Sequence, residues 1–170
     1  GIIDDLEWGG SAIADGFVEV MPAENEPAIT ETQVFVTYDK KNLYVAFKAF
    51  DDPSKIRAHQ SKRDAIFEDD MVGLILDTQN DGVMAYQFFC NPLGNQGDGQ
   101  KFGQSEREDW DAVWTSSGRM TETGYEIEMA IPSVVSGIGH TIQYLSDVNI
   151  IVTPIQSGHG EFYMEICYNE

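Results

Sequence analysis

Short runs of β-branched and aromatic residues, each ended by turn-forming residues, are the feature that most constrains the fold of this chain. From residue 32 onward the runs alternate apolar with polar positions, and a helical period is nearly absent. Because side chains alternate across a strand, Glu126 and Glu128 should face solvent while Tyr125, Ile127 and Met129 are buried. The pattern predicts an all-β chain with three hairpins, formed by residues 33–38 with 43–50, 71–76 with 83–90, and 119–121 with 125–131.

Two further strands, at 147–153 and 162–168, bring the expected total to about nine or ten. This number and spacing predict a two-sheet antiparallel β-sandwich of the immunoglobulin-like or jelly-roll-like kind. Residues 91–103 contain four glycines and few large apolar side chains, which predicts a long loop. Residues 52–65 should form an irregular crossover with a short helical turn near 63–65. Long loops on a rigid sandwich commonly carry function.

The size and charge of the chain limit the number of its domains and the kinds of partner that it can bind. Its 170 residues fit a single domain, 1–170, with a core large enough to need no metal or disulfide. The formal charge of −19 repels phosphate backbones and excludes nucleic acid as a partner. The same carboxylates could provide a solvated acidic surface, or oxygen ligands for calcium, and both interpretations remain open.

Cysteine and histidine usage argues against a zinc site and against an enzyme. Cys90 and Cys167 lie in apolar strand-like stretches, where they are either buried free thiols or one long-range disulfide. The three histidines are His59, His140 and His159, and no nucleophile motif accompanies them. Glu126 and Glu128 alternate as carboxylates do on any solvated sheet face, so they do not indicate a glycosidase.

The ends of the sequence bear on its context. No stretch approaches 18 apolar residues, and residues 1–5 do not read as a secretion signal. We expect the chain to be a fragment of a longer polypeptide from which any signal has been removed.

Several short blocks, in order, resemble one family. The chain resembles the carbohydrate-binding module family 9-like domains, in the branch found at the N-terminus of larger bacterial envelope proteins. The resemblance covers about residues 1–132 and rests on Asp4-Asp5-Leu6-Glu7-Trp8, Glu26-Pro27-Ala28, Thr32-Gln33-Val34, Tyr38-Asp39 with Leu43-Tyr44-Val45, Arg63-Asp64, Asp69-Asp70-Met71-Val72-Gly73 ending at Asp77, Asn91-Pro92-Leu93-Gly94, Trp110-Asp111-Ala112-Val113-Trp114, and residues 124–132 (GYEIEMAIP).

The resemblance implies a noncatalytic β-sandwich in the periplasm, the cell envelope or the secreted fraction. It also implies a covalently linked downstream domain, either an enzyme or an outer-membrane barrel through which the protein associates with that membrane. After residue 132 the sequence departs from the branch, because 133–140 is rich in glycine and 149–153 contains no arginine.

The resemblance also implies a sugar platform. In sugar-binding members an aromatic residue before the acidic block stacks on a pyranose ring, and its counterpart here is Phe67. Two polar anchors of such members align with Gly73 and Phe89 in this chain, so both anchors are replaced. Phe67 could equally be an apolar residue of the core or of a pocket wall.

Other candidate contacts come from the residues themselves. The spacing of Trp110 and Trp114 in a strand-like segment places both on one face, as core residues or as a second platform. Arg63 is either an ion-pair partner that fixes a loop or a ligand anchor. Hydrogen bonds to a sugar could come from Asn91, Asp98 or Gln100. We predict carbohydrate-binding residues Phe67, Arg63, Asn91, Trp110 and Trp114.

Three alternatives accompany the sugar-binding hypothesis. A calcium ion could be held by Asp69, Asp70, Asp77 and Asp81, although their spacing follows no EF-hand. A haem-binding sandwich could use Met71, Met84, Met129 or His140, although isolated methionines in strands are ordinarily core residues. The domain could instead be an interaction or gating module for a barrel, with no sugar ligand.

Overall fold

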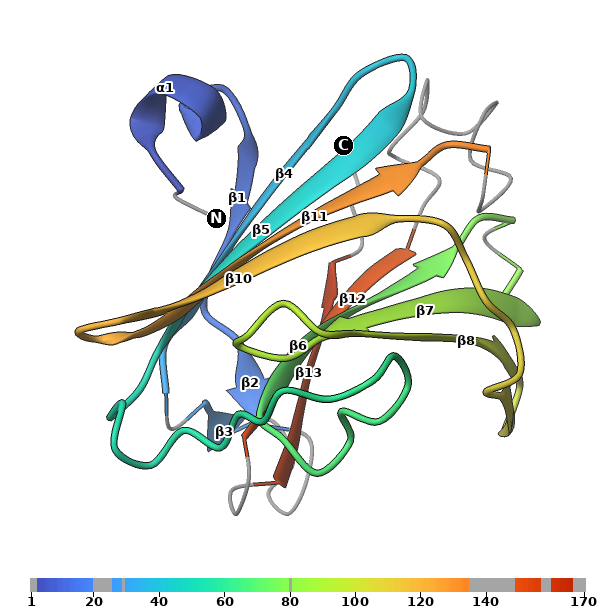
Figure 1. Cartoon of the computed structure of the whole chain (residues 1–170). Coiled ribbons are helices and arrows are strands. Elements are labelled where there is room, and N and C mark those ends of the chain that lie inside the picture. The colour runs from blue at the N-terminus through green and yellow to red at the C-terminus, as the bar shows by residue number, and fades with distance from the viewer. Residues whose placement is uncertain are drawn as a thin grey trace.

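A computed structural model describes residues 3–19, 26–28, 30–79, 81–134, 149–156 and 160–166, which form two antiparallel sheets packed face to face (Figure 1). The first sheet has five strands in the order β1 (Ala12–Ala14), β4 (Thr32–Tyr38), β5 (Asn42–Phe50), β11 (Gly124–Pro132) and β10 (Thr115–Thr121). The second has eight strands in the order β3 (Glu26–Pro27), β2 (Val18–Glu19), β13 (Gly160–Ile166), β12 (Asn149–Gln156), β6 (Met71–Asp77), β7 (Met84–Cys90), β8 (Gln96–Phe102) and β9 (Ser105–Arg107).

The architecture confirms the predicted two-sheet sandwich. Of the 13 strands within the described ranges, nine are seven to nine residues long, and the others have two or three residues. The three predicted hairpins are present as β4 with β5, β6 with β7, and β10 with β11. The two late strands, β12 and β13, also pair with each other. No helix among the described residues is long and apolar enough to cross a membrane.

The first hairpin shows how a turn residue sets a register. Asp39 Oδ1 accepts hydrogen bonds from the backbone N–H groups of Lys41 at 2.7 Å and Asn42 at 2.8 Å. These two bonds lower the pKa of the Asp39 carboxyl group. A side chain that bonds its own backbone two or three residues ahead is the usual reason for aspartate in turns.

Alternation along the strands builds one core between the sheets. In the first sheet Val34, Val45 and Ile127 point inward, and in the second sheet Leu74 and Phe88 do; all five are fully buried. The outward positions of the first sheet are more polar, and Glu126 and Glu128 are partly exposed there, as predicted.

The prediction of a long loop at 91–103 is wrong, because residues 96–102 form strand β8. The turn before it is short, with Asn91 N–H donating to the Asn95 carbonyl at 3.0 Å. Two of the four glycines that suggested a loop, Gly97 and Gly99, lie in β8, where other segments of the chain pack closely over them. Residues 51–70 are an irregular crossover, as predicted, with a turn but no helix at 63–64.

A close backbone contact ties the two sheets at the turn between β7 and β8. A Cβ atom added to Gly118 on β10 would lie 2.5 Å from the Pro92 carbonyl oxygen, and Ser116 Oγ donates to the Gly94 carbonyl at 2.9 Å. A side chain at position 118 would therefore force β10 away from this turn.

Gly118→Ala should destabilise the domain by about 1–3 kcal/mol, as expected for overpacking at a rigid contact. The measurement is the free energy of unfolding in urea. Gly10→Ala is the matched control, because a Cβ atom there meets nothing within 4 Å. Equal stability of the two variants would contradict the proposed role of the contact.

Candidate functional site

The crossover segment brings Phe67 onto the outer face of the second sheet. A Cβ atom added to Gly97 on β8 would lie 3.2 Å from Ile66 Cδ1 and 3.5 Å from Phe67 Cζ, so a larger residue there would force the Ile66 side chain to shift. The Phe67 ring meets Phe89 edge to face, with ring centroids 6.0 Å apart and an interplanar angle of 72°. Phe67 remains 51% exposed. We call Phe67 and Phe89 the aromatic shelf.

Strand register explains why this shelf is apolar. Gly73, Phe89 and Gly97 are paired across β6, β7 and β8. Gly73 and Phe89 are the two positions at which the resemblance implies polar anchors. Here these two adjoining positions carry no charge and leave room for rings. Phe89 belongs to the site, whereas the sequence analysis treats it only as the position of a replaced polar anchor. The register of the hairpin formed by residues 71–76 and 83–90 places Phe89 on this face.

Polar groups lie one step along the same face. Gln87 is paired with Ile75 and Gly99, two residues from Phe89, and is largely buried. Its Nε2 donates to Glu106 Oε1 at 3.3 Å. An amide and a carboxylate therefore lie near the shelf, and both groups can bind hydroxyls.

The two tryptophans lie on the opposite side of the second sheet. Phe88 points into the core, and its ring centroid is 6.0 Å from that of Trp110 and 5.5 Å from that of Trp114. The 110–114 segment pairs with no strand, yet both rings contact Phe88 from one side. Trp110 is partly exposed, whereas Trp114 is only 5% exposed. The sheet therefore separates both tryptophans from Phe67.

Arg63 is tied to two other segments, β8 and residues 110–114. Its Nη2 donates to Asp98 Oδ1 in a short ion pair and to the Ala112 carbonyl at 2.6 Å, and its Nη1 donates to Gln96 Oε1 at 2.8 Å. The side chain of Asp98 is fully buried, and burial raises its pKa even though Arg63 and the Ala112 N–H oppose the shift. Arg63 thus fixes a loop through an ion pair, which is one of the two roles predicted for it from the sequence.

A shallow pocket of about 400 Å³ does bring Arg63 and Trp114 together, with Gln60 and Gln96 also in its wall. The Trp114 indole N–H is buried and has no hydrogen-bond partner among the residues that the structure describes. Phe67 is not among the described residues that line this pocket.

Asn91 is buried and bonded within the protein. Its Nδ2 donates to Asp69 Oδ2 at 2.9 Å and to the His59 carbonyl at 3.0 Å, while its Oδ1 accepts from the N–H groups of Leu93 and Asn95. Desolvation raises the pKa of Asp69, but hydrogen bonds from His59 and Asn91 outweigh it, so that the pKa is lowered. Asn91 thereby anchors the segment that carries Phe67.

The four carboxylates predicted to hold calcium are not brought together. Asp69 and Asp70 precede β6, whereas Asp77 ends it, and a seven-residue strand spans about 20 Å. Asp77 accepts the Gln79 and Gly82 N–H groups, and Asp81 accepts that of Val83, so both organise a turn. The described residues contain one cluster of three acids, Asp64, Asp98 and Asp111, and the Arg63 guanidinium lies among them.

The structure describes some of the residues on which the cysteine and haem interpretations depend. Cys90 is a buried free thiol, and burial raises its pKa to about 12. Cys167 and His140 lie outside the described residues. Met129 belongs to the core between the sheets, whereas Met71 lies on the other face of the second sheet, in line with Gly73. These two methionines do not face a common space.

Comparison with known proteins adds independent findings. The family model of carbohydrate family 9 binding domain-like proteins matches residues 1–152. A crystal structure of a protein from Bacteroides uniformis proposed to bind carbohydrate is similar at a TM-score of 0.65 and 14% identity, covering 97% of this chain and 82% of that one. None of the curated proteins matches the chain.

Two further solved structures are of a carbohydrate-binding module of family 9 from Caldicellulosiruptor kristjanssonii. One is a complex with cellotriose and the other a complex with glucose. Each has a TM-score of 0.57 and 14% identity, and they cover 99% of this chain and 80% and 81% of the other chains. At this identity the likeness shows the fold.

Arg63→Ala should destabilise the domain by about 2 kcal/mol or more, because it leaves the buried Asp98 carboxylate without its cation. Urea denaturation measures the change. Arg107→Ala is the control, since Arg107 pairs with Asp109 at 3.3 Å on the exposed surface. If both variants lose the same stability, the Arg63 contacts contribute no more than a surface pair.

Asp69→Asn should flatten the loss of stability in acid. Because the native pKa of Asp69 is lowered, its carboxylate stabilises the fold above the unfolded pKa of about 3.9, and this contribution disappears as the pH falls through the native value. The variant should be less stable at neutral pH and lose less on acidification below about pH 4. Unfolding curves across this range, with Asp15→Asn as an exposed control, test it; parallel profiles for wild type and Asp69→Asn would contradict it.

Proposed function

The chain belongs to the carbohydrate family 9 binding domain-like family, and from this membership we propose that it binds a glycan or oligosaccharide without catalysis, through the aromatic shelf. The observation that carries the proposal is the Phe67 ring, 51% exposed and held against Phe89 on an outer sheet face. An exposed aromatic ring beside a second ring on a sheet face offers apolar area that a ligand can cover.

The chemistry of the shelf suits a neutral sugar. One face of a pyranose presents C–H groups that stack on a flat ring, while its hydroxyls need hydrogen-bonding partners at the edge. Gln87 and Glu106 supply an amide and a carboxylate on the same face. The shelf offers no paired charges, so stacking supplies most of the contact.

The other residues predicted to contact a sugar hold the segments around the aromatic shelf in place. Arg63 fixes the crossover four residues before Phe67, and Asn91 fixes it two residues after, through Asp69. We assign both as positioning residues. Trp110 and Trp114 pack on Phe88 beneath the sheet, and Trp114 and Arg63 could add a polar contact at their own shallow pocket.

The setting of the domain follows from the family branch that the sequence resembles. We place it in the periplasm, the cell envelope or the secreted fraction of a bacterium, joined to a further domain. The charge of −19 is compatible with a surface that meets millimolar calcium, so glycan titrations should be run with and without a chelator.

Phe67→Ala should weaken binding of cello-oligosaccharides by about two- to tenfold, the usual contribution of one aromatic contact. Isothermal titration with glucose and cellotriose measures it, since these are the ligands of the similar family 9 structures. Phe102→Ala is the matched control, because Phe102 is also an exposed phenylalanine of the second sheet, at 39%. No binding across a broad glycan set would overturn the proposal in favour of an interaction module.

A further inference from the structure

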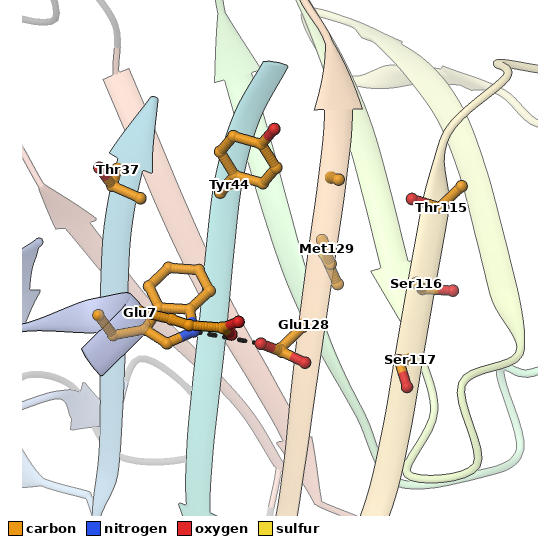
Figure 2. Close-up of a pocket in the computed structure, with 10 residues that line it drawn as sticks. Glu7, Thr37, Tyr44, Thr115, Ser116, Ser117, Glu128 and Met129 are labelled. Atoms are coloured by element: carbon orange, nitrogen blue, oxygen red, sulfur yellow. Dashed lines mark hydrogen bonds between the residues drawn. The ribbon is translucent and has the colours of Figure 1, made fainter. Parts of the chain in front are cut away.

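A second hollow lies on the outer face of the first sheet, on the far side of the sandwich from Phe67. It has a volume of about 480 Å³, within the usual range of small-ligand pockets. Its wall includes Trp8, and Figure 2 labels the other residues that matter here: Glu7, Tyr44, Thr115, Ser117 and Glu128. We call this the α1 pocket, after the helix at its side.

Strand register creates the depth of the α1 pocket. Ala130 of β11 is paired with Tyr44 of β5 on one side and with Thr115 of β10 on the other. In the next outward row Glu128 is paired with Ala46 and Ser117. Alanines on the two central strands therefore leave space between a ring, a carboxylate and the hydroxyls of an edge strand.

The N-terminal segment closes one side of the pocket. Helix α1 (Asp5–Trp8) begins after Asp4, whose Oδ1 accepts the Glu7 N–H at 3.0 Å, as an N-cap does. The Trp8 ring packs with Ala46 and meets Phe35 edge to face at 6.4 Å. Figure 1 shows α1 outside the sandwich, against this sheet.

Two polar groups of the pocket are fixed before any ligand arrives. The Trp8 indole Nε1 donates to Glu128 Oε1 at 3.1 Å, which sets the orientation of that carboxylate (Figure 2). The Tyr44 hydroxyl accepts from Asn42 Nδ2 at 3.0 Å and lies 3.2 Å from Asp39 Oδ2. Such preorganisation lowers the entropy cost of binding.

We propose that the α1 pocket is a second sugar-binding site, selective for a non-anionic sugar residue and preferring an amino sugar. The Tyr44 ring offers a stacking surface, Glu128 accepts hydroxyl or ammonium protons, and Ser117 and Thr115 offer hydroxyls at the rim. No Lys or Arg is among the described residues that line the pocket, and Glu7 adds a second carboxylate, so uronic acids are repelled.

This site is independent of the aromatic shelf. The shelf lies on the outward face of the second sheet, and the α1 pocket lies on the outward face of the first. The whole core separates them. One domain would therefore hold two sugar residues that face away from each other.

The Trp8 indole N–H is a site-specific reporter. The chain has three tryptophans, and two of them contact Phe88 in the core. In ¹H–¹⁵N spectra of the whole chain, titration with glucosamine should shift the Trp8 indole signal in a saturable way, glucose should do so more weakly, and glucuronate should not. Ethanolamine, which has the amine and lacks the ring, should leave it unchanged.

Glu128→Gln tests the carboxylate and should weaken glucosamine binding about tenfold or more, because a charged hydrogen bond is replaced by a neutral one. Glu126→Gln is the matched control: Glu126 faces the same way on β11, pairs with Arg119 at 2.5 Å and lies outside the pocket. Should Glu128→Gln fail to fold, Ser117→Ala on the exposed edge strand provides a second test, with weaker glucosamine binding expected.

The outcomes separate this proposal from the shelf. Phe67→Ala should leave the Trp8 response unchanged, whatever it does to cellotriose binding. A Trp8 signal unmoved by both glucosamine and glucose overturns the α1 pocket as a sugar site. An equal shift with ethanolamine or glucuronate, an unchanged affinity in Glu128→Gln, or an unchanged affinity in Ser117→Ala overturns it too.

Discussion

The ion pair between Arg63 and Asp98 is the interaction on which the rest of the second sheet's outer edge depends. Strand β9 pairs with residues 100–102 of β8, so that in the described part of the chain the first half of β8 has a paired strand, β7, on one edge only. The turn at Arg63 and Asp64 covers the other edge: Asp64 N–H donates to the Gln96 carbonyl, and Asp64 Oδ1 accepts the Asp98 N–H. Bare strand edges invite pairing with other chains, so a covering turn is part of the fold's protection.

The same guanidinium also controls two segments that are remote in sequence. Through the Ala112 carbonyl it holds the segment that carries the tryptophans, and Asp98 Oδ2 accepts the Ala112 N–H at 2.5 Å. Arg63 also fixes the crossover of residues 51–70 at a point four residues before Phe67. Asp64 takes a left-handed conformation, with φ of 63°, to make this turn, a strain that aspartate tolerates better than most residues. One buried carboxylate thus positions both the inner and the outer surroundings of β8.

Much of the fold could be read from the sequence, because alternation and turn chemistry are local. The Asp39 turn and the alternation of Glu126 and Glu128 followed from neighbours in the chain. Strand β8 did not, since glycine favours a loop unless another segment lies over it, and the approach of Ile66 to Gly97 joins residues 31 positions apart. The candidate site was likewise predictable only where its arrangement depends on neighbours in the chain. The position of Phe67 relative to the tryptophans depends on which face of β7 each aromatic residue meets, which only the packed sheets decide.

The outer faces of the two sheets both have small residues next to an aromatic ring. Gly73 and Gly97 stand beside Phe89, and Ala46 and Ala130 stand beside Tyr44, so small residues on central strands leave hollows next to rings. The surroundings then differ in polarity. The shelf has lost the two polar anchors implied by the family resemblance and relies on apolar area, which discriminates weakly among sugars because most pyranoses offer a C–H face. The α1 pocket has a carboxylate whose orientation is set by the Trp8 indole, and a charged hydrogen-bonding group discriminates among ligands by their charge and by the position of their donors. We therefore expect specificity among sugars to depend on Glu128 more than on Phe67.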